Sequence, residues 1–135
     1  RYVTAVVSVE PEAAACVAPS LRAGEPVSVE TGTTVMAGLN CGTPSSLAWP
    51  FMQQGLDAAA AVSERADVRA AHDLAALGVA AGPCGAAGLA AARLALTGEG
   101  AEDRRRHLGV DATSVVVLVV TEGSAANPVP ALEEL

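Results

Sequence analysis

The stretch that decides the fold is GPCGAAGLAA, residues 82–91 of the 135 in this chain. Gly82 and Pro83 are typical of a tight turn that opens a helix, since proline fits the first helical position, where its missing N–H is no loss. The small residues that follow let the backbone approach its neighbours closely. The stretch therefore predicts a loop that leads into a helix over residues 85–96.

An apolar run at residues 115–120 follows later in the chain and ends in Thr121, Glu122 and Gly123. A short run of this kind predicts a buried strand, here residues 113–120. Ligands of open α/β sheets bind beyond the carboxyl ends of the strands, and helix starts offer free backbone N–H groups to anions. We therefore expect a ligand site where the glycine-rich turn meets the end of this strand.

The rest of the chain completes an α/β pattern. Buried strands are predicted at residues 2–9 and 56–63, and helices at residues 12–22 and 63–77. A short edge strand is expected at residues 27–30, followed by a loop at residues 31–34. Pro19 should kink or shorten the first helix. Thr43, Pro44 and Ser45 resemble a helix start that leads to Trp49, with Pro50 limiting its length.

This order predicts an α/β fold, a parallel sheet with flanking helices and right-handed crossovers. The expected domain covers residues 1–126, and residues 127–135 are expected to be a loop or frayed tail.

Composition narrows the classes of partner. Apolar residues make up 51% of the chain and aromatic residues only 2%, so small side chains must fill the core. The net charge is −7, and the one basic cluster, residues 104–107, follows acidic neighbours and is expected to be a solvated turn or helix end. Nucleic acid is therefore not an expected partner. Apolar runs stay below the ~18 residues of a membrane span, so no membrane partner is expected. An odd number of cysteines without the spacing of a secreted disulfide framework favours a cytoplasmic protein.

The three cysteines, Cys16, Cys41 and Cys84, lack the spacing of a disulfide framework or a zinc site, and no metal is expected. Cys84 lies where a helix begins, so its sulfur could touch a ligand, or it could simply pack a crowded turn. A nucleophilic role would need a base, and neither His72 nor His107 is tied to Cys84 by spacing.

Several segments, taken in order, resemble pyridoxal-phosphate enzymes of the tryptophan-synthase-like fold, in their carboxy-terminal part. These segments are VVSVEP at residues 6–11, TTVMAGLNCGTPS at residues 33–45, GPCGAAGL at residues 82–89 and TEG at residues 121–123. The second is the most discriminating, and it resembles an insert of the diaminopropionate ammonia-lyases. The fold that the resemblance implies is the large-domain part of fold-type II pyridoxal-phosphate enzymes.

The resemblance implies pyridoxal phosphate as cofactor, a small amino acid as substrate, and the α,β-elimination of 2,3-diaminopropionate to pyruvate and ammonia. In similar enzymes a neutral hydroxyl or thiol meets the pyridine nitrogen, and either Cys84 or Thr121 would hold that place. Gly82 and Gly85 would belong to the same cofactor side. Thr34, Asn40 and Cys41 would lie in the segment on the substrate side.

The chain departs from this family in having no lysine at all, so it lacks the family's Schiff-base lysine, and it also lacks the phosphate-binding glycine loop. We therefore expect a fragment of a longer lyase, inactive alone, whose partner is a missing amino-terminal half or a second copy in a homo-oligomer. A serine or threonine dehydratase fragment is the nearest alternative. A non-catalytic domain of the same fold that binds a small ligand is the other.

Overall fold

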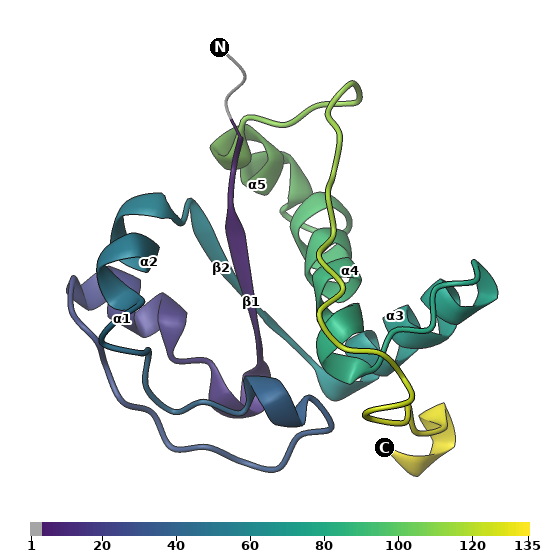
Figure 1. Cartoon of the computed structure of the whole chain (residues 1–135). Helices are drawn as coiled ribbons and strands as arrows, with labels where there is room; N and C mark the ends of the chain where they lie inside the picture. The colour runs from purple at the N-terminus through teal and green to yellow at the C-terminus, as the bar shows by residue number, and fades with distance from the viewer. Residues whose placement is uncertain (1–3) are drawn as a thin grey trace.

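The computed structural model describes residues 4–135 and is built around two short parallel strands (Figure 1). Strand β1 (Val7–Pro11) pairs with β2 (Ala58–Val62), with Val7 opposite Ala58 and Pro11 opposite Val62. Both strands were expected, although β1 begins five residues later than predicted and runs two residues further. Residues 2 and 3 of that prediction lie outside the described residues. The parallel sheet with flanking helices agrees with the predicted fold class.

Helix α1 (Val17–Ala23) is shorter than the helix expected at residues 12–22. A separate 3-10 turn, η1 (Glu12–Ala14), precedes it. Pro19 therefore lies in the first turn of α1, where a missing N–H removes no helical hydrogen bond. Gly24 ends the helix in the left-handed conformation at φ 76°.

The break between η1 and α1 is held by Glu10. This buried carboxylate accepts hydrogen bonds from the N–H groups of Cys16 at 3.0 Å and Val17 at 2.9 Å, and from the Cys16 thiol at 3.3 Å. Burial, followed by the hydrogen bond to Glu10, raises the pKa of Cys16 to about 12, so the thiol stays protonated. Glu10 thus satisfies backbone donors at the start of α1 that have no partner within the helix.

Replacing Glu10 by glutamine should lower the free energy of unfolding by about 1–3 kcal/mol, because the amide turns an N–H₂ group toward backbone donors. Urea unfolding of both proteins measures this change. The exposed neighbour Glu12, replaced by glutamine in the same way, should change the free energy by less than about 0.5 kcal/mol. Equal stability of the two variants would contradict the prediction.

The middle of the chain differs from the prediction in two places. Residues 27–30 form no strand, although Val29 donates its N–H to the carbonyl of Gly42 at 2.8 Å. Helix α2 (Trp49–Gly55) begins beside Pro50, which thus opens the helix and does not limit it. The turn at residues 43–45 leads into α2 through the bond from the Trp49 N–H to the Ser45 carbonyl at 2.8 Å. A short 3-10 turn, η2 (Ala37–Leu39), interrupts the preceding loop.

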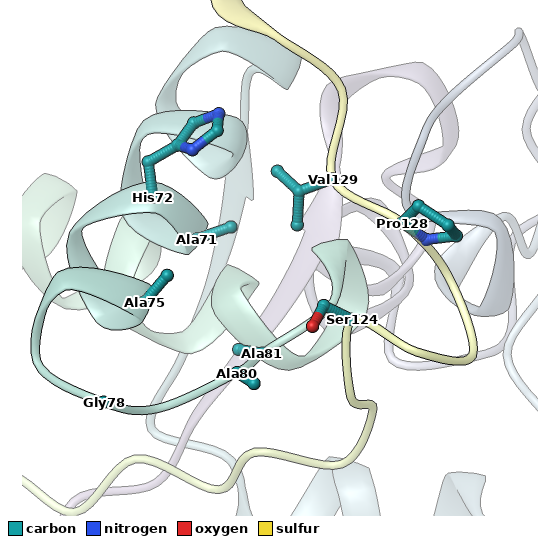
Figure 2. Close-up of a pocket in the computed structure, with 9 residues that line it drawn as sticks. All are labelled: Ala71, His72, Ala75, Gly78, Ala80, Ala81, Ser124, Pro128 and Val129. Atoms are coloured by element: carbon teal, nitrogen blue, oxygen red, sulfur yellow. The ribbon is translucent and has the colours of Figure 1, made fainter.

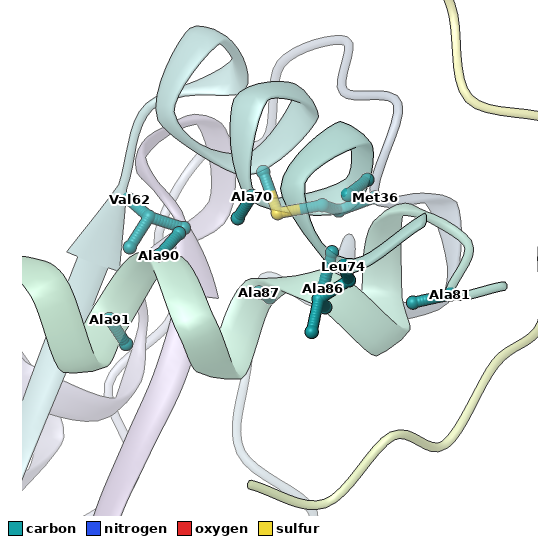
Figure 3. Close-up of a cluster of buried hydrophobic side chains, with 10 residues drawn as sticks. Met36, Val62, Ala70, Leu74, Ala81, Ala86, Ala87, Ala90 and Ala91 are labelled. Atoms are coloured by element: carbon teal, nitrogen blue, oxygen red, sulfur yellow. The ribbon is translucent and has the colours of Figure 1, made fainter. Parts of the chain in front are cut away.

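Helices α3 (Glu64–Ala76) and α4 (Pro83–Leu96) form where the sequence predicts them. Ser63 caps α3 by accepting a hydrogen bond from the Ala66 N–H at 3.3 Å. In Figure 1, α1 and α2 lie on one side of the sheet and α4 on the other. Small side chains of α3 and α4 meet in the core, with Met36 between them (Figure 3).

The basic cluster lies within a helix, α5 (Ala101–Leu108), and most of it is in the last turn, which agrees with the expected helix end. Arg104 and Arg105 donate to carbonyl oxygens of Ala95, Leu96 and Thr97 at 2.6–3.2 Å. These carbonyls lie at the end of α4, where positive charge is favourable. The cluster therefore ties two helices together. Arg106, as expected, pairs with its acidic neighbours Glu102 and Asp103.

The strand predicted at residues 113–120 is wrong. This segment has no regular structure, and Val115 and Val117 are 87% and 80% exposed. It runs along α4, where Leu118 lies near Gly88 and Val120 near Gly85, and no strand within residues 4–135 pairs with it. Beyond this segment, Gly123 pairs with Ala81 in an isolated antiparallel bridge.

Residues 127–135, expected to be a loop or frayed tail, contain a short 3-10 turn, η3 (Leu132–Glu134). The tail is also bound to the rest of the domain, because His72 on α3 contacts the Pro130 carbonyl at 3.0 Å. Among the described residues, no helix is long and apolar enough to cross a membrane.

Candidate functional site

The candidate site lies where the start of α4 meets residues 121–123. The carboxylate of Glu122 accepts the N–H of Cys84 at 2.9 Å, and the Glu122 carbonyl accepts the N–H of Gly82 at 2.9 Å. Glu122 therefore bonds the turn that opens α4 through both its side chain and its backbone. The sequence marked each of these two segments as part of a ligand site, but it did not predict that Glu122 would bond one to the other.

Gly82 and Gly85 are needed for this close approach. A Cβ on Gly82 would lie 2.9 Å from a carboxylate oxygen of Glu122 and 2.9 Å from the Gly123 carbonyl. A Cβ on Gly85 would overlap the Glu122 carbonyl and lie 3.0 Å from Val120. Both glycines are buried, so they shape the wall of the site without presenting a side chain to a ligand.

The free N–H groups expected at the start of α4 are partly taken, because Glu122 occupies the N–H of Cys84. A carboxylate at a helix N-terminus is stabilised by the helix dipole. This helix start thus carries an internal anion, which corrects the expectation of an open anion site.

Cys84 is half-buried, and its sulfur lies 3.3 Å from the position of a Cβ on Gly38. Burial, followed by the hydrogen bond to Glu122, raises the pKa of the Cys84 thiol. The thiol is therefore neutral at pH 7. Thr121, next to Glu122, has an exposed side chain with a neutral hydroxyl. These two groups can each form a hydrogen bond to a ligand nitrogen without placing a charge beside it.

Segment 34–41 forms a second wall. The Thr34 hydroxyl accepts the Met36 N–H at 3.1 Å, and Leu39 packs against the core beside Cys84. Asn40 donates its side-chain amide to the Gly32 carbonyl at 3.1 Å, and Cys41 is exposed. Thr34 therefore adjoins the part of the segment that reaches α4. Asn40 and Cys41 follow that part in the exposed return of the loop.

Two residues that the sequence analysis did not assign to the site, Glu64 and Asn127, hold this wall in place. The N–H of Val35 donates to Glu64 at 2.8 Å, and the Val35 carbonyl accepts from the Asn127 amide at 2.9 Å. Asn127 also lies 3.4 Å from the Glu122 carboxylate. The sequence contains a weak indication for Glu64, which is the first residue after the predicted helix cap Ser63. It contains no indication for Asn127, because this residue was assigned to the tail.

The chain has a separate open cavity of about 480 Å³ between α3 and the carboxy-terminal segment. Figure 2 shows Ala71 and Ala75 of α3 on one side and Ser124, Pro128 and Val129 on the other. Its lining is mostly small and apolar. Within residues 4–135, no group of three or more His, Cys, Asp or Glu side chains could hold a metal ion.

A model of the family described as "Pyridoxal-phosphate dependent enzyme" matches residues 2–122. The chain is similar to the solved threonine deaminase of T.th., with 32% identity over 67% of this chain and 33% of that one and a TM-score of 0.62. Maize serine racemase shows 32% identity over 65% of this chain and 27% of that one, with a TM-score of 0.61.

A fungal L-serine ammonia-lyase from Rhizomucor miehei shares the fold, with 23% identity, a TM-score of 0.68, and coverage of 88% of this chain and 36% of that one. The chain thus spans about a third of the length of these solved structures. No curated protein matches it.

Proposed function

This chain belongs to the family of pyridoxal-phosphate dependent enzymes, and we propose that it is part of an ammonia-lyase that acts on 2,3-diaminopropionate. The observation that carries the proposal is the position of segment 34–41. This segment lies within residues 33–45, which resemble an insert of the diaminopropionate ammonia-lyases, and its Gly38 lies directly beside the Cys84 sulfur. The lyase-like insert thus adjoins the turn that resembles the cofactor side of the family.

The residues around α4 fit the cofactor of this family, pyridoxal phosphate. Gly82 and Gly85 keep the turn free of side chains, and Cys84 and Thr121 are neutral groups at its edge. The cofactor, when bound, supplies an electron sink for the bond that breaks. A neutral hydrogen-bond partner leaves the ring nitrogen unprotonated, and we assign that place to Cys84 or Thr121.

The chain contributes the walls of the site and not its lysine, since it contains none. Alone it should therefore be inactive, and the lysine must come from the rest of the natural protein or from another chain. Thr34, Asn40 and Cys41 are proposed to orient the substrate, because they belong to the segment whose Gly38 lies beside the Cys84 sulfur. Leu39 and Met36, which fix that wall in the core, should help to exclude water.

The reaction is balanced by one water molecule. Proton removal from C2 of 2,3-diaminopropionate and cleavage of the bond between C3 and its nitrogen release one ammonia. Water then hydrolyses the remaining enamine, which gives pyruvate and the second ammonia. Serine would give pyruvate and one ammonia by the same steps, with water leaving from C3.

A serine or threonine dehydratase is the second candidate, and the similarity to a threonine deaminase at 32% identity favours it. The two candidates share the Cys84 turn and differ in the group that leaves C3. A non-catalytic domain of the same fold that binds a small ligand is the remaining hypothesis. The absent lysine is what supports it.

Assay of the full-length natural protein should separate these candidates. We expect pyruvate with two ammonia per pyruvate from 2,3-diaminopropionate, and a kcat/KM at least about tenfold above those for serine and threonine. The measurement couples pyruvate or 2-oxobutyrate reduction to an ammonia determination in the same reaction. Preference for serine or threonine would establish the dehydratase. No turnover of any of the three would favour the binding domain.

A further inference from the structure

Asp67, in the first turn of α3, is a buried acid whose carboxyl group has no partner in the described part of the chain. Its exposed fraction is 0%, and neither carboxyl oxygen has a hydrogen-bond partner within residues 4–135. An ionised carboxylate in such a place is very costly, so the group either takes up a proton or must be neutralised by a cation. Burial, followed by the charges of Glu64 and Glu122, raises the pKa of Asp67 to about 7.

The neighbours of Asp67 supply negative charge. Glu64 is three residues before it on α3, and the charge of Glu122, whose carboxylate binds the start of α4, also acts on it. The other titratable or charged groups on α3 and on the elements packed against it are Arg65, Arg69, His72, Asp73, Cys84, Arg93, Glu133 and Glu134. Among the described residues, the ion pairs involve none of Glu64, Asp67 and Glu122.

These two neighbours are the residues that hold the walls of the candidate site. Glu64 binds the Val35 N–H at 2.8 Å, and Glu122 binds the Cys84 N–H at 2.9 Å. Asn127 joins the two sides, since its amide donates to the Val35 carbonyl and lies 3.4 Å from Glu122. A negative charge at Asp67 would therefore repel both carboxylates, Glu64 and Glu122, at the same time.

We propose that Asp67 is a positioning residue that holds segment 34–41 against the start of α4 while its carboxyl group is neutral, and releases that segment when it ionises. Ionisation would add a third negative charge to those of Glu64, which binds this segment, and Glu122, which binds the start of α4. Glu64 and Glu122 would then separate from Asp67, and each would pull on the backbone N–H that it binds. The inference does not depend on which amino acid is the substrate.

A proton accounts for the neutral state better than a metal ion does. The described part of the chain offers no group of three side chains placed to hold a metal. The two oxygens of Asp67 are enclosed among residues of α3 and its neighbours, with no exposed surface. A bound monovalent cation is the competing explanation, and the experiment distinguishes it.

Hydrogen exchange of the full-length natural protein, read by mass spectrometry, tests the proposal. After correction for the intrinsic exchange rate, protection of peptides containing Val35 and Cys84 should fall about tenfold between pH 6 and pH 8.5. Asp67→Asn, which cannot ionise, should keep high protection throughout. Glu64→Gln keeps a carbonyl acceptor for Val35 but removes one like charge, so the midpoint of the fall should move to lower pH.

The matched control is Asp73→Asn, because Asp73 lies on the same helix but is half-exposed and paired with Arg93 at 2.6 Å. It should leave the pH profile unchanged. A wild-type profile without the fall would overturn the proposal, as would the same fall in Asp67→Asn. If Asp67→Asn does not fold, an unmoved midpoint in Glu64→Gln overturns it. Loss of the fall in potassium chloride, but not in tetramethylammonium chloride, would show a bound cation and also overturn it.

Discussion

Gly85→Ala is expected to lower the free energy of unfolding by about 2–3 kcal/mol, although it adds a single methyl group. In an exposed helix the same change would be stabilising. Here the new Cβ would overlap the carbonyl oxygen of Glu122 and lie 3.0 Å from a methyl of Val120. To relieve this overlap, residues 120–123 must move away from α4, which also lengthens the bond between Glu122 and the Cys84 N–H. Urea unfolding monitored by circular dichroism measures the loss.

Gly88→Ala is the matched control for this prediction. Gly88 lies three residues further along α4, and a Cβ there would make ordinary contacts with Leu118 at 3.8 Å and 4.0 Å. Alanine should therefore stabilise the helix by up to about 1 kcal/mol, the intrinsic preference over glycine. If Gly85→Ala is as stable as Gly88→Ala, the close approach of Glu122 to α4 is not the constraint that the structure implies.

Local signals in the sequence are sufficient to predict the elements whose stability is local. Ser63 followed by an apolar stripe gives α3, and Gly82 with Pro83 gives the start of α4. The sequence of α5 is harder to interpret, because its arginines act on the carbonyls at the end of another helix. The stabilisation that these arginines provide depends on a tertiary contact. A run of like charges has no periodicity from which this contact could be predicted.

The valine run at residues 113–120 is a case in which a strong local signal gave a wrong prediction. Its composition favours a strand, yet a strand forms only when another strand supplies hydrogen-bond partners. Within the described residues, β1 and β2 pair with each other, and α4 lies beside the run. Apolar composition therefore predicts burial correctly only when the covering surface is present.

The candidate site was predictable in its parts but not in its connections. The glycine turn and residues 121–123 are sequence features, and the structure brings them together through Gly82 and Glu122. Segment 34–41 was marked by resemblance. The residues that join it to α3 and to the tail, Glu64 and Asn127, are distant in sequence from Val35 and match no local pattern. Side-chain bonds to backbone groups across such separations can be found only from the folded structure.

Met36→Ala is expected to have the second large effect, a loss of about 2–4 kcal/mol in the free energy of unfolding. Met36 is fully buried, and its side chain fills the space between Ala70 and Leu74 of α3 and Ala86 of α4 (Figure 3). The small side chains around it cannot extend to fill the cavity that alanine would leave. Because Met36 belongs to a loop, the substitution should also free segment 34–41 from the helices.

The measurement is urea unfolding together with hydrogen exchange of the peptide that contains Val35. Met52→Ala is the matched control, since Met52 is only half-buried on α2 and its loss should cost about 1 kcal/mol. Faster exchange at Val35 in Met36→Ala, with unchanged exchange there in Met52→Ala, would mean that the core side chain anchors the wall beside Cys84. A cost for Met36→Ala no greater than that for Met52→Ala would mean that Glu64 and Asn127 hold the segment without it.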